Sequence, residues 1–180
     1  ADLAAFTAGV NFLLNKFPGG APGNALPRNF NQNLVLAKID WLINSSNTLS
    51  TSYNYLNSRA LNGIQTVLVT GSTGSNGSDD VRTHNVNVRL TSIISSRMVN
   101  EFRGHFSRDF EFEFGNQPPH NVSVGGFAFG RATYLERFAY PDERKLQFVD
   151  NFSYMAGTHA FKFGAEAVRS TDRINSSGGF

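Results

Sequence analysis

The stretch NLVLAKIDWLINSSNTLSTSYNYLNS (Asn33–Ser58) decides the fold class. In its first part, Asn33–Ile43, apolar residues recur at every second position, which predicts a β-strand with one apolar face. A short polar turn, Asn44–Asn47, leads into a second alternating run, Thr48–Ser58. The apolar positions are Val35, Ala37, Ile39, Trp41 and Ile43 in the first run and Leu49, Tyr53 and Tyr55 in the second. The stretch therefore predicts an antiparallel hairpin.

Four further runs alternate in the same way and have strand length: Arg82–Thr91, Met98–Arg108, Lys145–Met155 and His159–Arg169. Short turns are expected near Ser92–Ser96 and at Ala156–Thr158. Long stretches, about Arg59–Asp80 and Asp109–Glu143, separate the hairpins. The chain therefore predicts six antiparallel strands whose connections alternate strictly between short and long.

The first 30 residues have a different character. Asp2–Lys16 is the one segment that predicts a helix, and Phe17–Phe30 contains three Pro and three Gly, which predicts an irregular loop. We therefore divide the chain into a short helix and Pro/Gly-rich loop, residues 1–30, and a β-domain, residues 31–180.

The composition narrows the classes of function. The chain has 180 residues, which is enough for one domain, and no Cys, which excludes disulfides and thiolate metal sites. A net charge of +2 gives no strong basic patch, so we expect no nucleic-acid partner. The sequence lacks the run of about 18 apolar residues that a transmembrane helix needs. We expect the chain to be a fragment of a longer protein.

Two fold classes explain the alternation. In a soluble β-sandwich the apolar face is the core, whereas in an outer-membrane β-barrel it meets lipid and the polar face meets a watery lumen. Runs of about ten residues match a tilted membrane crossing, and alternating short and long connections match periplasmic turns and outer loops. Aromatic residues also lie near the strand ends, as in interfacial girdles: Trp41, Tyr53, Tyr55, Tyr154 and Phe161. These features favour the barrel.

Three sequence motifs strengthen this interpretation. LAKIDWLINSSNTLSTSYNY (Leu36–Tyr55) resembles a hairpin of TonB-dependent outer-membrane receptors. RMVNEFRGHFSRDF (Arg97–Phe110) resembles a strand of the same family, and QFVDNFSYMAGTHAFKFGAEAVR (Gln147–Arg169) resembles another of its hairpins. The three motifs occur in the same order as in that family. They are most similar to the Oar-like branch, which has a carboxypeptidase-regulatory-like domain ahead of the plug.

The resemblance implies about six strands of a larger transmembrane β-barrel of about 22 strands. Such receptors import siderophores, glycans, peptides or similar bulky nutrients across the outer membrane of Gram-negative bacteria. The implied partners are outer-membrane lipid, the plug domain of the same parent chain, and the TonB energy complex, reached through an N-terminal part that this chain lacks. The alternative is a soluble or surface-attached β-sandwich that binds glycan or protein.

Two sets of residues are candidate functional groups. The first set is expected to face the lumen: Lys38, Asp40, Arg89, Glu101, Arg103, Lys162 and Glu166. Pairing of these ions across neighbouring strands is favoured over substrate binding. The second set lies in a long outer loop, where substrate contact is expected: Asp109, Glu111, Glu113, Phe127, Phe129 and Arg131. Its three alternating carboxylates could hold Ca²⁺ or a cationic ligand, although a solvated hairpin face is the favoured interpretation.

Motifs for catalysis are weak. TVLVTGSTGSNG (Thr66–Gly77) has the glycine spacing of a nucleotide-binding turn, but a β-alternating run follows where that motif requires a helix. A loop tip is therefore predicted. The four histidines lack metal-ligand spacing: His84, His105, His120 and His159. We expect no enzymatic activity, no cofactor and no metal ligand.

Overall fold

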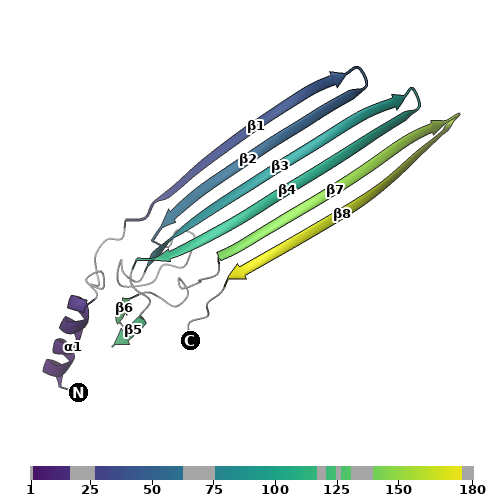
Figure 1. Cartoon of the computed structure of the whole chain (residues 1–180). Helices are drawn as coiled ribbons and strands as arrows, with labels where there is room; N and C mark the ends of the chain where they lie inside the picture. The colour runs from purple at the N-terminus through teal and green to yellow at the C-terminus, as the bar shows by residue number, and fades with distance from the viewer. Residues whose placement is uncertain are drawn as a thin grey trace.

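The computed structural model describes residues 2–16, 27–62, 76–116, 121–124, 127–130 and 140–175. Their elements are α1 (Leu3–Lys16), β1 (Phe30–Asn44), β2 (Asn47–Leu61), β3 (Gly77–Ser95), β4 (Met98–Gly115), β5 (Asn121–Val124), β6 (Phe127–Gly130), β7 (Tyr140–Ala156) and β8 (His159–Asn175). Six of the strands form one antiparallel sheet in the order β1-β2-β3-β4-β7-β8, while β5 and β6 form a separate hairpin (Figure 1). The predicted all-β fold with six antiparallel strands is confirmed.

The sheet has two distinct ends. The three short turns, β1–β2, β3–β4 and β7–β8, lie together at one end, which we call the turn end (Figure 1). The strand ends that the long connections join lie at the other end with α1 and the β5–β6 hairpin, and we call it the loop end (Figure 1). None of the residues of α1 is buried. No helix in the described part of the chain is long and apolar enough to cross a membrane.

The strands of the sheet are longer than the alternation predicted. They have 15–19 residues, whereas the runs suggested about ten. The extra length lies mainly at the loop end, so the predicted long stretches Arg59–Asp80 and Asp109–Glu143 are wrong at their edges. Strand β2 continues to Leu61 and β3 begins at Gly77. In β2 and β3 the sequence period fades there because polar residues occupy both faces, while the backbone pairing continues. Strand β4 keeps the period, with Phe110 and Phe112 on the apolar face.

The turn predicted at Ser92–Ser96 is also wrong. Strand β3 continues to Ser95, and β4 begins at Met98. The apolar pair Ile93 and Ile94 interrupts the alternation, and a register shift follows at this point. The turn therefore lies later in the sequence, between Ser95 and Met98.

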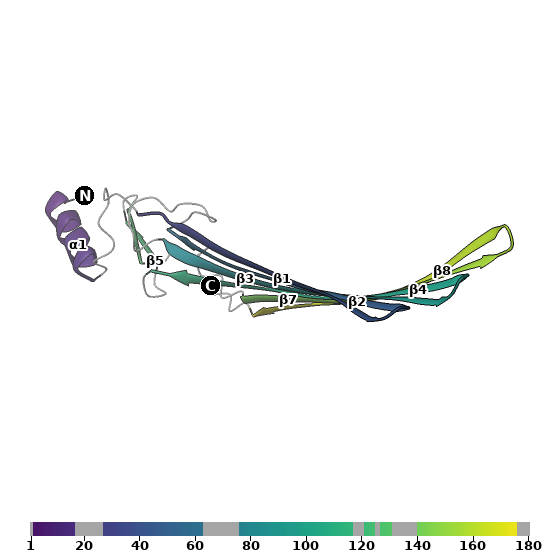
Figure 2. The ribbon, with the colours of Figure 1, turned by 90° about the horizontal axis from the view of Figure 1, so that it is seen from above.

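The turns are staggered along the sheet. Asn47 at the first turn pairs with Ser92, beyond which β3 extends for three more residues to Ser95. Met98 pairs with Tyr154, and the β7–β8 hairpin projects further still. The sheet is also twisted, so that its strand order inverts between the two ends in the view along its plane (Figure 2). Stagger in one direction is what tilted strands need in order to close into a barrel.

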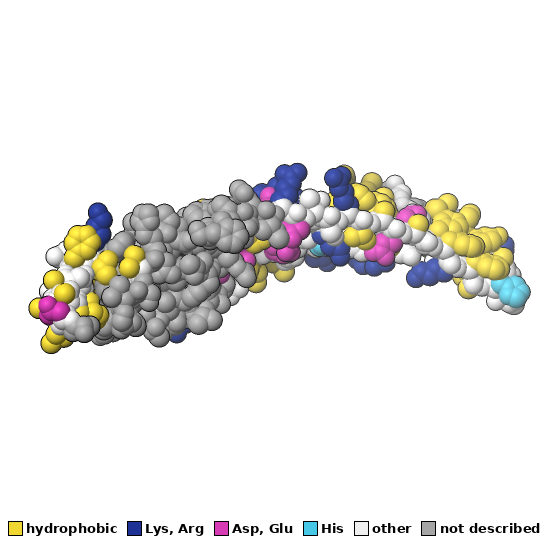
Figure 3. All heavy atoms as spheres, turned by 90° about the horizontal axis from the view of Figure 1, so that it is seen from below, with side chains coloured by type: hydrophobic (Ala, Val, Ile, Leu, Met, Phe, Trp, Pro, Cys, Tyr) yellow, Lys and Arg dark blue, Asp and Glu magenta, His cyan; other side chains and the backbone are white. Residues whose placement is uncertain are grey.

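The register separates the sheet into two faces that we call the apolar face and the polar face. Residues of the apolar face include Val35, Ala37, Ile39, Trp41, Val88, Leu90, Phe102, Phe106, Leu146, Phe148, Phe161 and Phe163. Most of these side chains remain well exposed, and hydrophobic groups gather toward the turn end (Figure 3). Ala60 is the one buried hydrophobic residue in the described part. The sandwich alternative required a covered aromatic face, which the described residues do not provide.

Candidate functional site

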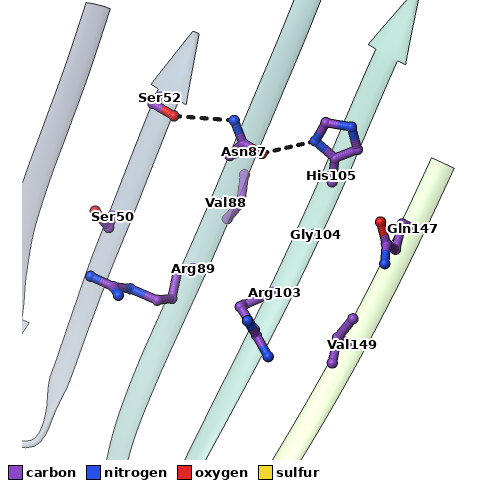
Figure 4. A pocket seen from close by; sticks show the side chains of 10 residues that line it. All are labelled: Ser50, Ser52, Asn87, Val88, Arg89, Arg103, Gly104, His105, Gln147 and Val149. Carbon is purple, nitrogen blue, oxygen red and sulfur yellow. Dashed lines mark hydrogen bonds between the residues drawn. The ribbon is translucent and has the colours of Figure 1, made fainter. Parts of the chain in front are cut away.

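A recess of about 370 Å³ lies in the middle of the polar face (Figure 4). Strands β2, β3, β4 and β7 line it with two neighbouring rows of directly paired residues. The first row consists of Ser52, Asn87, His105 and Gln147, and the second of Ser50, Arg89, Arg103 and Val149. Residues far apart in sequence thus meet because every second residue of each strand points to this face.

The first row is connected by hydrogen bonds. The Asn87 side chain donates from Nδ2 to Ser52 Oγ at 3.4 Å, and its Oδ1 lies 2.8 Å from His105 Nδ1. Because an amide oxygen only accepts, the proton of this bond belongs to the His105 ring. Gln147 donates from Nε2 to Glu166 Oε1 on β8 at 2.5 Å. These bonds hold the row in a fixed orientation.

The second row brings two cations together. Arg89 and Arg103 are direct partners across β3 and β4. Arg103 Nε lies 3.2 Å from Glu101 Oε1, whereas Arg89 is exposed and has no carboxylate within ion-pair distance among the residues described. Like charges in direct cross-strand positions repel each other. The recess therefore favours an anionic group, which would relieve this repulsion.

The structure places all seven expected lumen-facing ions on the polar face. The expected pairing across strands is wrong for two of the ion pairs. Lys38 pairs with Asp40 at 2.8 Å, and Arg103 pairs with Glu101, in each case along one strand. The reason is that directly opposed positions do not alternate in charge, while long side chains two residues apart on one face reach each other.

An acidic cluster occupies the polar face at the loop end. Asp109 pairs with Glu143, which in turn pairs with Asp172, so three carboxylates form one row across β4, β7 and β8. Asp109, Glu111 and Glu143 line a second recess of about 130 Å³. The sequence indicated Asp109 and Glu111 but missed Glu143 and Asp172, because only the strand register brings them together. Glu113 pairs in register with Asp79.

Asp79 is the buried member of this acidic region. Its side chain belongs to a residue only 5% exposed, and Oδ1 has no hydrogen-bond partner in the part of the chain described. The pKa of Asp79 is raised to about 6. Burial is the largest cause, and the negative charges of Glu111 and Asp80 add to it. The sequence alone does not indicate this residue, since no local pattern distinguishes Asp79 from the half-buried Asp80 beside it.

The remaining candidates are scattered. Phe127 and Phe129 lie on β6, where they pair in register with Val124 and Val122. Arg131 and most of Thr66–Gly77 lie outside the described residues. Among the residues described, no group of three or more His, Cys, Asp or Glu side chains could hold a metal ion.

The comparison with known proteins agrees with this architecture. The model of a family described as an outer membrane beta barrel domain matches residues 11–179. No curated protein and no solved structure matches the chain. The match covers nearly the whole sheet, with its exposed apolar face, polar opposite face and staggered turns. The chain belongs to the outer membrane β-barrel domain family and is located in the outer membrane.

Proposed function

We propose that the chain forms part of the barrel wall of a TonB-dependent, Oar-like receptor that imports a bulky nutrient, such as a siderophore, a glycan or a peptide. The observation that supports this proposal is the position of the three sequence motifs in the sheet. Leu36–Tyr55 lies on the β1–β2 hairpin, Arg97–Phe110 on β4, and Gln147–Arg169 on the β7–β8 hairpin. All three belong to one sheet, with their short turns at the same end.

The polar face supports a role in transport. In a barrel it lines the lumen, so the recess at Arg89 and Arg103 faces either a passing solute or the plug domain. A carboxylate from the plug or an anionic group of the solute would neutralise the opposed arginines. The acidic cluster at the loop end, around Glu111 and Glu143, lies nearer the outer mouth and disfavours anions there.

Energy dependence tests the proposal most directly. In the bacterium that carries the gene, its deletion should abolish growth on one nutrient from a panel of ferric siderophores, glycans and peptides. Removal of the inner-membrane energy complex should abolish the same growth. Uptake that persists without the energy complex would instead identify a passive channel and contradict the proposal.

A lumen variant sharpens the test. Arg89→Gln combined with Arg103→Gln removes both opposed cations and should alter uptake of the nutrient several-fold or more. Lys162→Gln is the matched control, since Lys162 also lies on the polar face but outside the recess. Equal effects of the two variants would argue against a specific role for the recess.

A further inference from the structure

On β7 and β8 the apolar face gives way to arginines toward the loop end, and on β4 an arginine lies between Phe106 and Phe110. Arg108 on β4 pairs in register with Arg144 on β7, and Arg144 pairs with Thr171 on β8. Arg169 and Arg173 lie two residues to either side of Thr171 on the same face, so they are diagonal neighbours of Arg144 at about 7–8 Å between Cα atoms. We call these four residues the arginine patch: Arg108, Arg144, Arg169 and Arg173.

One carboxylate, that of Asp142, pairs with two of the four arginines. Asp142 accepts two hydrogen bonds from Arg108, from Nε at 2.6 Å and Nη2 at 3.0 Å. It accepts two more from Arg144, from Nε at 3.0 Å and Nη2 at 2.5 Å. Arg169 and Arg173 are exposed, and neither has a carboxylate within ion-pair distance in the part of the chain described. The patch therefore has a surplus of three positive charges.

The patch lies at the outer boundary of the membrane. Leu146, Phe106 and Ala167 are the last apolar residues before it on the three strands, so it follows the lipid-contacting band without a gap. In outer-membrane barrels the short turns are periplasmic and the long connections are extracellular. The loop end is accordingly the outer side, and the guanidinium groups lie at the head-group level of the outer leaflet.

Guanidinium chemistry indicates what binds there. Arginines bind phosphate oxygens through paired N–H donors, and Arg108 and Arg144 already present such forks to Asp142. A ligand from the lumen cannot reach the outside of the barrel, whereas a lipid that covers the adjoining apolar band places its head group on the patch. We propose that the arginine patch binds the phosphate groups of an anionic lipid of the outer leaflet. This proposal is independent of the transported nutrient.

Native mass spectrometry of the intact protein, purified from the outer membrane in a neutral detergent, tests the proposal. The probes are lipid A with two phosphates and the same lipid after removal of both phosphates. The wild type should bind the phosphorylated lipid more tightly. Arg169→Gln with Arg173→Gln should weaken that binding roughly 25-fold at low salt, at about fivefold per arginine. This pair leaves the Arg108–Asp142–Arg144 contacts intact, so folding should be retained.

The matched control is Lys145→Gln. Lys145 follows Arg144 on the same strand but lies on the polar face, where it pairs with Ser107. Its substitution should leave lipid binding unchanged, and inorganic phosphate at millimolar concentration should not displace the lipid. Equal binding of the dephosphorylated lipid, an unchanged affinity in the arginine variant, or an equal loss with Lys145→Gln would each overturn the proposal.

Discussion

Asp142 and Asp79 lie near the loop end of one sheet, yet on opposite faces and in opposite electrostatic surroundings. On the apolar face, hydrogen bonds from Arg144 and Arg108 hold the pKa of Asp142 well below its ordinary value. On the polar face, burial and the charge of Glu111 raise the pKa of Asp79 to about 6. The two faces thus differ in charge beyond the membrane as well as in hydropathy within it. Cations collect where lipid head groups lie, and carboxylates collect at the mouth of the lumen.

The largest effect of a substitution is expected from a charge on the face that meets lipid. Val88→Arg places a charge at the centre of the apolar band on β3 and should lower the free energy of unfolding by ~2–4 kcal/mol in lipid vesicles. Val168→Arg makes the same change on the polar face of β8 and should alter it by at most about 0.5 kcal/mol. Urea titration followed by fluorescence of Trp41, the one tryptophan of the chain, measures both. Equal losses would mean that the faces are wrongly assigned.

The sequence predicts this central band well, for a physical reason. Where one side meets lipid and the other meets water, every second residue must be apolar, and the run Arg82–Thr91 shows it clearly. Strand β1 already weakens the pattern, because Leu34, Leu36 and Leu42 lie on its polar face. At the loop end most strands carry polar residues on both faces, as β3 does from Ser78 to Asp80, so these strand ends could not be predicted. Strands β5 and β6 have only four residues each, which is too short for a period to show. The opposed Arg89 and Arg103 depend on register, which turn lengths and bulges determine.

Within the arginine patch, the substitution Asp142→Asn should lower stability. The substitution removes the acceptor shared by Arg108 and Arg144 and should cost ~1–3 kcal/mol at pH 7. Because the folded-state pKa of Asp142 lies below its ordinary value of 3.8, this contribution is present above about pH 4 and is lost as the pH falls further. Unfolding titrations at pH 7 and pH 3 measure the difference.

Asp172→Asn is the matched control for Asp142→Asn. Asp172 lies on the polar face of β8, beside Glu143 and in the same row as Asp109. Its loss relieves repulsion within the acidic row, so stability at pH 7 should stay constant or rise. A loss as large as that of Asp142→Asn would contradict the contrast between the two faces.

In the acidic region of the polar face, Asp79→Asn should increase stability, whereas Asp142→Asn decreases it. Since the folded-state pKa of Asp79 lies above its ordinary value of 3.8, wild-type stability falls as the pH rises from about 4 through about 6. The variant lacks this loss and should be more stable than the wild type by about 1–2 kcal/mol at pH 7, with no gain at pH 3.5. Asp80→Asn should lower stability instead, because Asp80 binds Arg82 at 3.1 Å and Asn57 at 3.1 Å. If Asp79→Asn and Asp80→Asn shift stability in the same direction, burial of Asp79 is not what disfavours its charge.

One glycine on each face allows the smallest change in the comparison, the addition of a single methyl group. A Cβ at Gly164, on the polar face, would lie 2.7 Å from Asn151 Oδ1 and 3.2 Å from the Asp150 carbonyl oxygen. A Cβ at Gly104, on the apolar face, would meet the Phe148 ring at an ordinary 3.7 Å. Gly164→Ala should therefore lower the free energy of unfolding by about 1 kcal/mol, because Asn151 must move. Gly104→Ala should raise it by about 0.5 kcal/mol, because alanine restricts the unfolded chain more than glycine does. If Gly164→Ala is as stable as Gly104→Ala, the side chains of the polar face rearrange freely. The charged groups on the polar face would then be held less rigidly than those on the apolar face.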